Sequence, residues 1–250
     1  MTILCIETST AVCSAAICKD GVPVAQRICR EGANHAQLLP RFVEELLQEA
    51  RTQRLTLEAV AVSDGPGSYT GLRIGASTAK GLCYSMDLPL VPVPTLKILV
   101  EAGRKQVVND PKYGPSYILI PLMDARRMEV YTLGEKGKPA AVIVENEESL
   151  LESWRKHVVL PPPYTLETEN KPIYYFGDGA AKCQKVLTDP LWHYWPDIVP
   201  EAQYMGIIVE DAIIKAHLDH SGPINVDIAY YEPTYLKEFI AAPSHVKGLK

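Results

Sequence analysis

The order of predicted strands and helices occurs twice along this chain of 250 residues, and that repetition restricts the possible folds more than any other feature. In the first half, alternating and continuous apolar segments predict strands, and apolar residues three or four apart predict helices. The elements expected in the first half are strands at 2–6, 12–18, 22–28, 59–63 and 90–93, and helices at 34–50, at 71–86 and from Thr95 onward.

A stretch rich in Pro, Gly and Asn at 107–115 precedes a second series of the same kind. The elements expected there are strands at 117–123, 129–133, 140–144 and 173–176, and helices at 147–157, 179–187 and 202–220. Residues 161–171 interrupt this second series and are interpreted as a surface insertion.

Each half therefore offers three strands followed by alternating helices and strands, which predicts an α/β chain with two lobes facing a cleft. This plan resembles the duplicated actin-like ATPase and sugar-kinase fold, the ASKHA or ribonuclease H-like fold. We expect an N-terminal lobe at 1–106 and a C-terminal lobe at 107–201. The segment at about 202–236 would rejoin the first lobe, and 237–250 would be a tail.

Composition and charge restrict the partners of the chain. Hydrophobic residues make up 47% of it, enough for a full core, and the net charge of -5 comes without a basic cluster. RNA contact would therefore be shared with a partner protein. No basic leader or apolar span begins the sequence, so we expect a cytoplasmic protein without a membrane segment. The six cysteines form no Cys-x-x-Cys pair and are interpreted as buried thiols.

A glycine-rich loop between a buried strand and a helix is the most specific motif. Its residues of interest are Gly65, Gly67, Ser68, Thr70, Gly71 and Arg73. Thr70 is expected to cap the helix, so that free N–H groups face the mouth of the loop. This geometry suits an anion, but a structural strand-to-helix turn is the favoured interpretation. Arg73 would brace the loop through Asp64 or meet a carboxylate of a partner.

Small residues four apart follow that loop along its helix. They would permit close helix packing, either inside the lobe or against a second chain, and the apolar stripe of the helix at 34–50 leaves the same two alternatives. The candidate partner face is Leu39, Phe42, Val43, Leu46, Tyr69, Leu72, Gly75, Ala76 and Ala79.

The two turns that should face the cleft carry carboxylates without the glycine expected for phosphate binding. They read Glu7-Thr8-Ser9 and Asp124-Ala125-Arg126, and Gly177-Asp178-Gly179 stands where the superfold contacts adenosine. We interpret Glu7, Asp124, Arg126, Gly177 and Gly179 as a vestigial nucleotide site that binds nucleotide weakly if at all, and expect no cofactor.

Several segments together resemble the TsaB family, formerly called YeaZ. They are residues 6–9, 35–40, 65–75, 124–131, 177–180 and 233–237. The resemblance covers nearly the whole chain. It implies a non-catalytic scaffold that binds and activates a TsaD-like transferase, with a TsaE-like ATPase, during threonylcarbamoyladenosine formation at adenosine 37 of tRNA. It also implies a homodimer without those partners, and tRNA contact only within the complex.

The sequence lacks the motifs that the catalytic alternatives would require. TsaD-like enzymes hold a metal with a His-x-x-x-His pair, whereas Leu39 stands four residues after His35, so no metal is expected. His217 and His220, three residues apart on the last predicted helix, are interpreted as solvent-facing or as helix-capping residues rather than as metal ligands. The glycoprotease-type peptidase alternative would depend on Ser68 and His35 meeting in space, because neither His-Glu-x-x-His nor Gly-x-Ser-x-Gly occurs. A small-molecule kinase or nucleotide-binding ATPase of the same superfold is the other alternative.

Overall fold

The computed structural model describes residues 1–32, 34–108, 117–133, 139–144, 146, 148, 172–219 and 224–237. The expected helix at 147–157, the insertion at 161–171 and the tail beyond Lys237 lie almost wholly outside these residues. Within the described helices, none is long and apolar enough to cross a membrane.

Five strands form the sheet of the N-terminal lobe, in the order β3-β2-β1-β4-β5. Their bounds are Thr2–Glu7 for β1, Cys13–Lys19 for β2, Val22–Cys29 for β3, Ala59–Ser63 for β4 and Leu90–Val93 for β5. The first three form an antiparallel meander, and β1, β4 and β5 run parallel. Every residue of β1 and β4 is buried, as expected for central strands covered on both faces.

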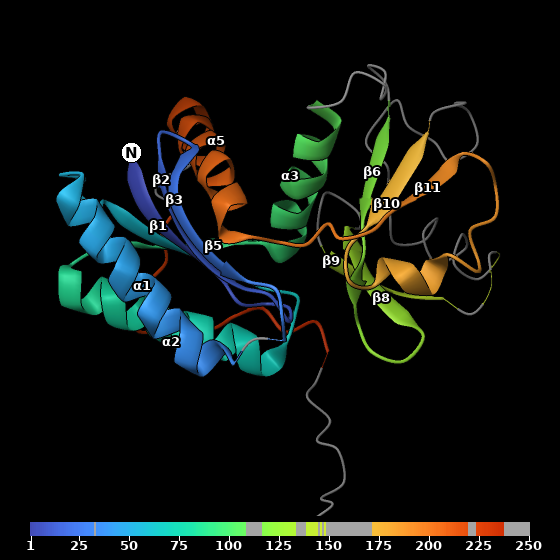
Figure 1. Cartoon of the computed structure of the whole chain (residues 1–250), viewed down its shortest axis with the longest axis horizontal. Helices are drawn as coiled ribbons and strands as arrows, with labels where there is room; N and C mark the ends of the chain where they lie inside the picture. Colours follow the sequence, from blue (N-terminus) through green and yellow to red (C-terminus); the bar gives the residue numbers. More distant parts are fainter. Residues whose placement is uncertain are drawn as a thin grey trace, which may run out of the picture.

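Helices cover both faces of this sheet (Figure 1). The helices α1 (His35–Thr52) and α2 (Tyr69–Met86) pack on one face, and α3 (Thr95–Val108) and α5 (Met205–Asp219) pack on the other. Each face has its own core, because alternate side chains of one strand point to opposite sides: Leu4 and Ile6 contact the first layer, and Ile3 and Cys5 the second.

The C-terminal lobe repeats the strand order of the first. The strands β6 (Ile118–Pro121), β10 (Ile173–Phe176) and β11 (Trp192–Trp195) are parallel, and β7 (Met123–Asp124), β8 (Glu129–Leu133) and β9 (Pro139–Ile143) are antiparallel. If β6 and β7 are taken as one strand, the order β9-β8-β7/β6-β10-β11 matches β3-β2-β1-β4-β5. The strand predicted at 117–123 is therefore interrupted at Leu122, whose amide donates to the carbonyl of Phe176.

One other prediction for this lobe was wrong, and one strand was missed. The helix predicted at 179–187 is only a 3-10 turn, Ala180–Cys183, and β11 was not predicted. The sequence WHYW has no clear alternation, because both faces of β11 are partly covered by aromatic rings: Tyr174 stacks on Trp195 at 4.2 Å between centroids, and Tyr175 lies near Tyr194 at 5.6 Å.

The helix α3 joins the lobes. Its residues Leu96 and Leu99 share a buried cluster with Met123 and Phe176 of the second lobe. A Cβ atom on Gly103 would lie 2.4 Å from the Phe176 ring, so only glycine permits this approach.

The segment 224–237 also runs from one lobe to the other. It begins with the pairing of Val226 and Leu90 and continues past α2, where Lys80 Nζ donates to the carbonyl of Tyr231 at 3.1 Å. It ends at Lys237, whose ammonium pairs with Glu129 of β8.

Candidate functional site: the interlobe cavity

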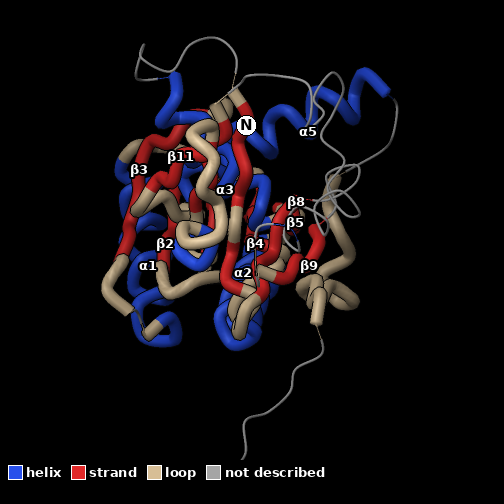
Figure 2. Tube along the Cα trace, turned by 90° about the vertical axis from the view of Figure 1, so that its right-hand side faces the viewer, coloured by secondary structure: helices blue, strands red, loops and turns tan. Residues whose placement is uncertain are grey.

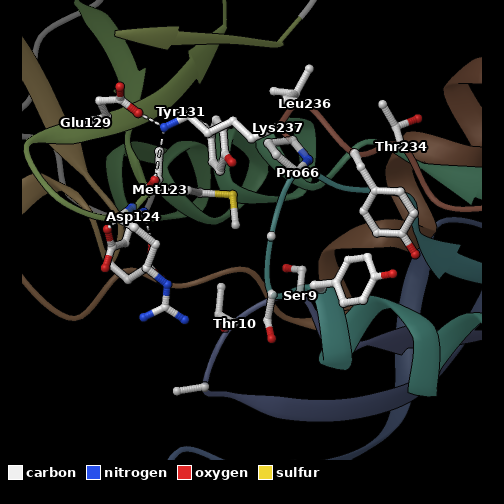
Figure 3. A pocket seen from close by; sticks show the side chains of 18 of the residues that line it. Ser9, Thr10, Pro66, Met123, Asp124, Glu129, Tyr131, Thr234, Leu236 and Lys237 are labelled. Carbon is white, nitrogen blue, oxygen red and sulfur yellow. Dashed lines mark hydrogen bonds and ion pairs between the residues drawn. The ribbon is translucent and has the colours of Figure 1, made fainter. Parts of the chain in front are cut away.

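A cavity of about 1100 Å³ lies where the two lobes and the segment 224–237 meet. Figure 3 shows Ser9, Thr10 and Pro66 of the first lobe and Asp124 and Glu129 of the second around this space. The lining residues are Ser9, Thr10, Ala11, His35, Pro66, Gly67, Ser68, Tyr69, Met123, Asp124, Ala125, Arg126, Arg127, Glu129, Tyr131, Asp178, Thr234, Tyr235, Leu236 and Lys237.

The glycine-rich loop forms one wall of the cavity and begins α2. Ser68, rather than the predicted Thr70, caps the helix: its Oγ accepts a hydrogen bond from Gly71 N at 3.3 Å, and Thr70 is exposed. The loop is held against the turn after β1, since Ser68 N donates to the Ser9 carbonyl at 2.6 Å. A Cβ on Gly67 would lie 2.5 Å from that carbonyl, which explains the glycine.

Asp64 fixes the segment 224–237 to this loop. Its carboxylate accepts hydrogen bonds from Tyr231 Oη at 3.1 Å and from Thr234 Oγ1 at 2.9 Å, and burial raises its pKa. Gly65 has φ +104°, and a Cβ there would lie 2.5 Å from the Thr234 carbonyl. Sequence reasoning missed this role of Asp64, because its hydrogen-bond partner Thr234 lies 170 residues away along the chain.

Arg73 does not brace the loop through Asp64, contrary to prediction. Its guanidinium lies 4.1 Å from the centroid of the Tyr69 ring, and its Nε donates to Tyr235 Oη at 3.3 Å. The rings of Tyr69 and Tyr235 are themselves 4.9 Å apart. Cation–π attraction replaces the expected ion pair, because Asp64 is already occupied by the segment 224–237.

Glu7 is fully buried and does not line the cavity, which corrects the expectation that it faces Asp124 across the cleft. Its Oε1 accepts a hydrogen bond from Ser9 N at 2.6 Å. Its Oε2 and the Ser9 hydroxyl have no hydrogen-bond partner within the described part of the chain. Burial raises the pKa of Glu7 to about 7, despite the opposing effect of the neighbouring Ser9, Ser63 and Thr8 groups.

Asp124 does line the cavity and is engaged by its own lobe. It accepts hydrogen bonds from Arg126 N at 2.7 Å and from the ammonium of Lys182. Burial alone would raise the pKa of Asp124, but Lys182 and the Arg126 amide hold it below its usual value. Arg126 is exposed at the cavity with φ +69°. No sequence pattern indicates the role of Lys182, which the 3-10 turn Ala180–Cys183 brings close to Asp124.

Gly177 and Gly179 lie beneath the cavity and not on its surface, contrary to the expected adenosine contact. A Cβ on Gly177, which has φ +111°, would lie 2.2 Å from the Leu122 carbonyl, and one on Gly179 would lie 2.5 Å from the Met123 carbonyl carbon. Both glycines let the turn after β10 pack against the interrupted strand. Asp178 between them lines the cavity and accepts a hydrogen bond from Asp124 N at 3.0 Å.

The predicted partner face also needs correction. Eight of its nine residues point into the N-terminal core: Leu39, Phe42, Val43, Leu46, Leu72, Gly75, Ala76 and Ala79 are all buried. Packing inside the lobe explains the glycine at position 75, since a Cβ there would lie 2.4 Å from Thr8 Oγ1. Only Tyr69 is partly exposed, and it lines the cavity. The small-residue stripe is therefore the inward face of α2.

The residues considered for the peptidase and metal-site alternatives can now be placed in the structure. His35 and Ser68 both line it, with His35 Nε2 3.3 Å from the Val12 carbonyl and the Ser68 hydroxyl engaged as the helix cap. Among the described residues, no three His, Cys, Asp or Glu side chains are arranged to hold a metal ion. His217 is exposed near the end of α5, and His220 lies outside the described residues.

Comparison with known proteins gives the family. The sequence profile of TsaD, described as tRNA N6-adenosine threonylcarbamoyltransferase, matches residues 30–215. The tRNA threonylcarbamoyladenosine biosynthesis protein TsaB of Haemophilus influenzae is 31% identical over 247 residues, which are 95% of this chain and 94% of that protein. The chain belongs to the TsaB family.

Other members give the same result. TsaB of Escherichia coli is 27% identical over 252 residues and 96% of each chain. The structure of YeaZ from Pseudomonas aeruginosa covers 94% of this chain and 99% of its own length, with a TM-score of 0.65 and 23% identity. That likeness supports the two-lobe fold, and the TsaB relatives connect the chain with threonylcarbamoyladenosine biosynthesis.

Proposed function

We propose that the chain is a non-catalytic subunit of the machinery that forms threonylcarbamoyladenosine on tRNA, where it binds and activates a TsaD-like transferase. Its membership of the TsaB family places it in this biosynthesis. The proposal that the chain is non-catalytic rests on the burial of Glu7, the carboxylate at the end of β1. Glu7 is fully buried, and its Oε1 accepts a hydrogen bond from Ser9 N, so a ligand in the cavity cannot contact it.

The second acidic turn supports the same conclusion. The charge of Asp124 is neutralised by Lys182. The space beside Gly177 and Gly179, where a phosphate could otherwise approach, is occupied by the backbone of Leu122 and Met123. In both lobes, groups that would handle a metal or phosphate in an active member of the superfold are instead buried or engaged by neighbouring residues of the chain.

The outward faces of α1 and α2 are the surface that we propose for the transferase. These helices lie side by side on the outer side of the N-terminal lobe (Figure 1). Their exposed residues include Arg41, Glu44, Gln48, Arg73, Ser77, Gly81 and Tyr84. Nothing described lies within 4 Å of a Cβ built on Gly81, and Tyr84 beside it is 83% exposed. A small residue next to an exposed aromatic offers both close approach and an anchor.

Reconstitution tests this proposal. Threonylcarbamoyladenosine on tRNA would be measured with ATP, threonine, bicarbonate, the adenylate-forming enzyme and the TsaD-like and TsaE-like proteins, with or without this chain. We expect modification to require the chain and to survive Glu7→Gln. Equal modification without the chain would contradict the scaffold role.

The partner face has its own test. We expect Gly81→Glu combined with Tyr84→Ala to abolish transferase binding, measured by calorimetry, and with it the stimulation of modification. Met128→Ser is the matched control, because Met128 is an exposed apolar residue on the other lobe. Retained binding by the α2 double variant would place the transferase elsewhere.

The cavity favours weak nucleotide binding as a second candidate function. Arg126, Arg127 and Lys237 supply cations around a space of about 1100 Å³, although Asp124, Glu129 and Asp178 line it too. Titration with a fluorescent ATP analogue would show saturable binding that Arg126→Ala weakens; an unsaturable signal in both proteins would dismiss this function.

A further inference from the structure

A buried carboxyl group lies behind the wall of the interlobe cavity, and neither proposed function uses it for a contact. Glu7 is the last residue of β1, and none of its side chain is exposed. Its Oε2 atom and the hydroxyl of Ser9 are both buried, and neither has a hydrogen-bond partner in the part of the chain that the structure describes. Buried polar atoms without partners are rare in folded proteins, so this pair of atoms requires a physical explanation.

The same carboxyl group is connected to the glycine-rich loop by two successive hydrogen bonds. Glu7 Oε1 accepts from Ser9 N at 2.6 Å, and the Ser9 carbonyl accepts from Ser68 N, also at 2.6 Å. Beside them, Thr8 Oγ1 donates to the Gly71 carbonyl at 2.8 Å. The loop follows β4 and begins α2, which lie next to each other in Figure 2. The turn after β1 therefore fixes the position of the loop and of the first turn of α2.

No positive charge forms an ion pair with Glu7 among the described residues. The titratable and charged groups nearest to it on the surrounding elements are Cys13 of β2, His35 of α1, Asp64 after β4 and Arg73 of α2. The carboxylate of Asp64 is engaged by the segment 224–237, and the guanidinium of Arg73 lies against Tyr69. His35 Nε2 lies 3.3 Å from the Val12 carbonyl. Ionised Glu7 would therefore be a buried charge without a cation, and burial raises its pKa to about 7.

We propose that Glu7 is a proton-controlled lock on the glycine-rich loop. The protonated carboxyl group is uncharged and stays beneath the turn. When it loses its proton to water, the remaining charge must be solvated, and the cavity lies on the other side of Ser9 (Figure 3). Water reaches Oε2 from the cavity when Ser9 moves, and that movement breaks the hydrogen bond from Ser68 N to the Ser9 carbonyl. Ionisation would thus release the loop from β1 and widen the cavity at this wall.

The closed loop should be most stable at low pH. The pKa of Glu7 is about 7 while the loop is closed, and it returns to about 4.5 when the carboxylate meets water. The closed state therefore binds the proton more tightly and loses stability as pH rises from about 4.5 to about 7. Hydrogen exchange of the Ser68 amide measures the opening, because this amide becomes free when the loop leaves Ser9. We expect its protection factor to fall roughly 10-fold between about pH 6 and about pH 8.

Two variants and one control amide test the role of Glu7. Glu7→Gln keeps an acceptor for Ser9 N and has no proton to lose, so the protection of Ser68 should be the same at both pH values. Ser9→Ala should move the fall in protection to higher pH, because the Ser9 side chain lowers the pKa of Glu7. The Ala125 amide, bonded to the Glu129 carbonyl in the corresponding turn of the other lobe, is the matched control and should not change. Far-UV circular dichroism confirms that both variants are folded.

Three outcomes would overturn the proposal. One is a protection factor of the wild-type Ser68 amide that is equal at the two pH values. Another is a fall in protection that persists in Glu7→Gln, because a different group would then control the loop. The third is equal protection of Ser68 and of the Val60 amide, which donates to the Pro89 carbonyl within the sheet, since the whole lobe would then be unfolding.

Discussion

The two lobes share one strand order but differ in how completely the layers around it are built. The N-terminal sheet has a continuous central strand, β1, and an 18-residue helix α2 after the glycine-rich loop. In the C-terminal lobe the matching strand is interrupted at Leu122, and a four-residue 3-10 turn stands where α2 stands in the first lobe. The same topology can therefore be stabilised by apolar cores on both faces of the sheet, as in the N-terminal lobe, or by fewer contacts made by aromatic rings and backbone, as in the C-terminal lobe.

The carboxylates after the central strands differ in the same way. Glu7 is buried with a raised pKa, whereas Asp124 is about one-third exposed with a lowered pKa. Exclusion of water disfavours the ionised form of Glu7 in the first lobe, whereas the ion pair with Lys182 favours the ionised form of Asp124 in the second. The difference teaches that equivalent positions in a duplicated fold can place a carboxyl group in opposite electrostatic environments.

The largest expected effect tests whether the two lobes unfold together. Leu46→Ala removes a fully buried side chain from α1 and should lower the free energy of unfolding by about 2–5 kcal/mol. All three tryptophans lie in the second half of the sequence, so their fluorescence reports mainly that lobe, while far-UV circular dichroism reports the helices. We expect both urea transitions to shift together, because α3 packs into a core of each lobe, through Ile98 in the first and through Leu96 and Leu99 in the second.

The exposed Gln48→Ala on the same helix is the control and should stay within about 0.5 kcal/mol of the wild type. A shift in the circular dichroism transition alone would show that the C-terminal lobe is stable independently.

Glu7→Gln is expected to change the pH dependence of stability. The pKa of Glu7 is raised to about 7 in the folded state, so the folded protein loses stability through this group as pH rises from about 4.5 to about 7. The variant keeps the acceptor for Ser9 N without the charge. It should be more stable than the wild type by up to about 3 kcal/mol at pH 8, and similar to it at pH 4. Urea unfolding at several pH values measures this, and a pH-independent difference would contradict it.

Gly75→Ala sharpens the distinction between the inner and outer faces of α2. The added methyl would lie 2.4 Å from Thr8 Oγ1, so we expect a loss of about 1–3 kcal/mol. Gly81→Ala on the same helix meets nothing within 4 Å and should gain up to about 1 kcal/mol from helix propensity. Thermal denaturation of both variants decides the matter; equal destabilisation would mean that the outer face is also tightly packed.

Asp124→Asn should have the smallest effect, with the opposite pH dependence. A lowered pKa stabilises the folded state above the unfolded value near 3.8, and that stability disappears as pH falls below it. Because Asp124 is about one-third exposed, we expect a loss below about 1 kcal/mol at pH 7. A double-mutant cycle with Lys182→Gln measures the coupling, and additive single effects would show that the ion pair contributes nothing.

The sequence by itself determined the order of strands and helices in the N-terminal lobe, but it missed β11 and the 3-10 turn in the C-terminal lobe. Local periodicity predicted β4 and β5 to the residue and α1 to within two, and the duplicated plan predicted the two-lobe α/β fold. The motif at 65–75 also indicated a loop that opens a helix, because glycine and proline favour turns locally, although the sequence analysis placed the cap at Thr70 and the structure has it at Ser68.

Only the tertiary structure decided which way side chains face and which distant groups meet. The stripe through Gly75 could have faced inward or outward, and the close approach of Thr8 from another element turned it inward. Asp64 meets Tyr231 across 167 residues, and Lys182 meets Asp124 across 58, contacts that leave no periodic trace in the sequence. Orientation, burial and ion pairing depend on what packs against an element, and that information is not local.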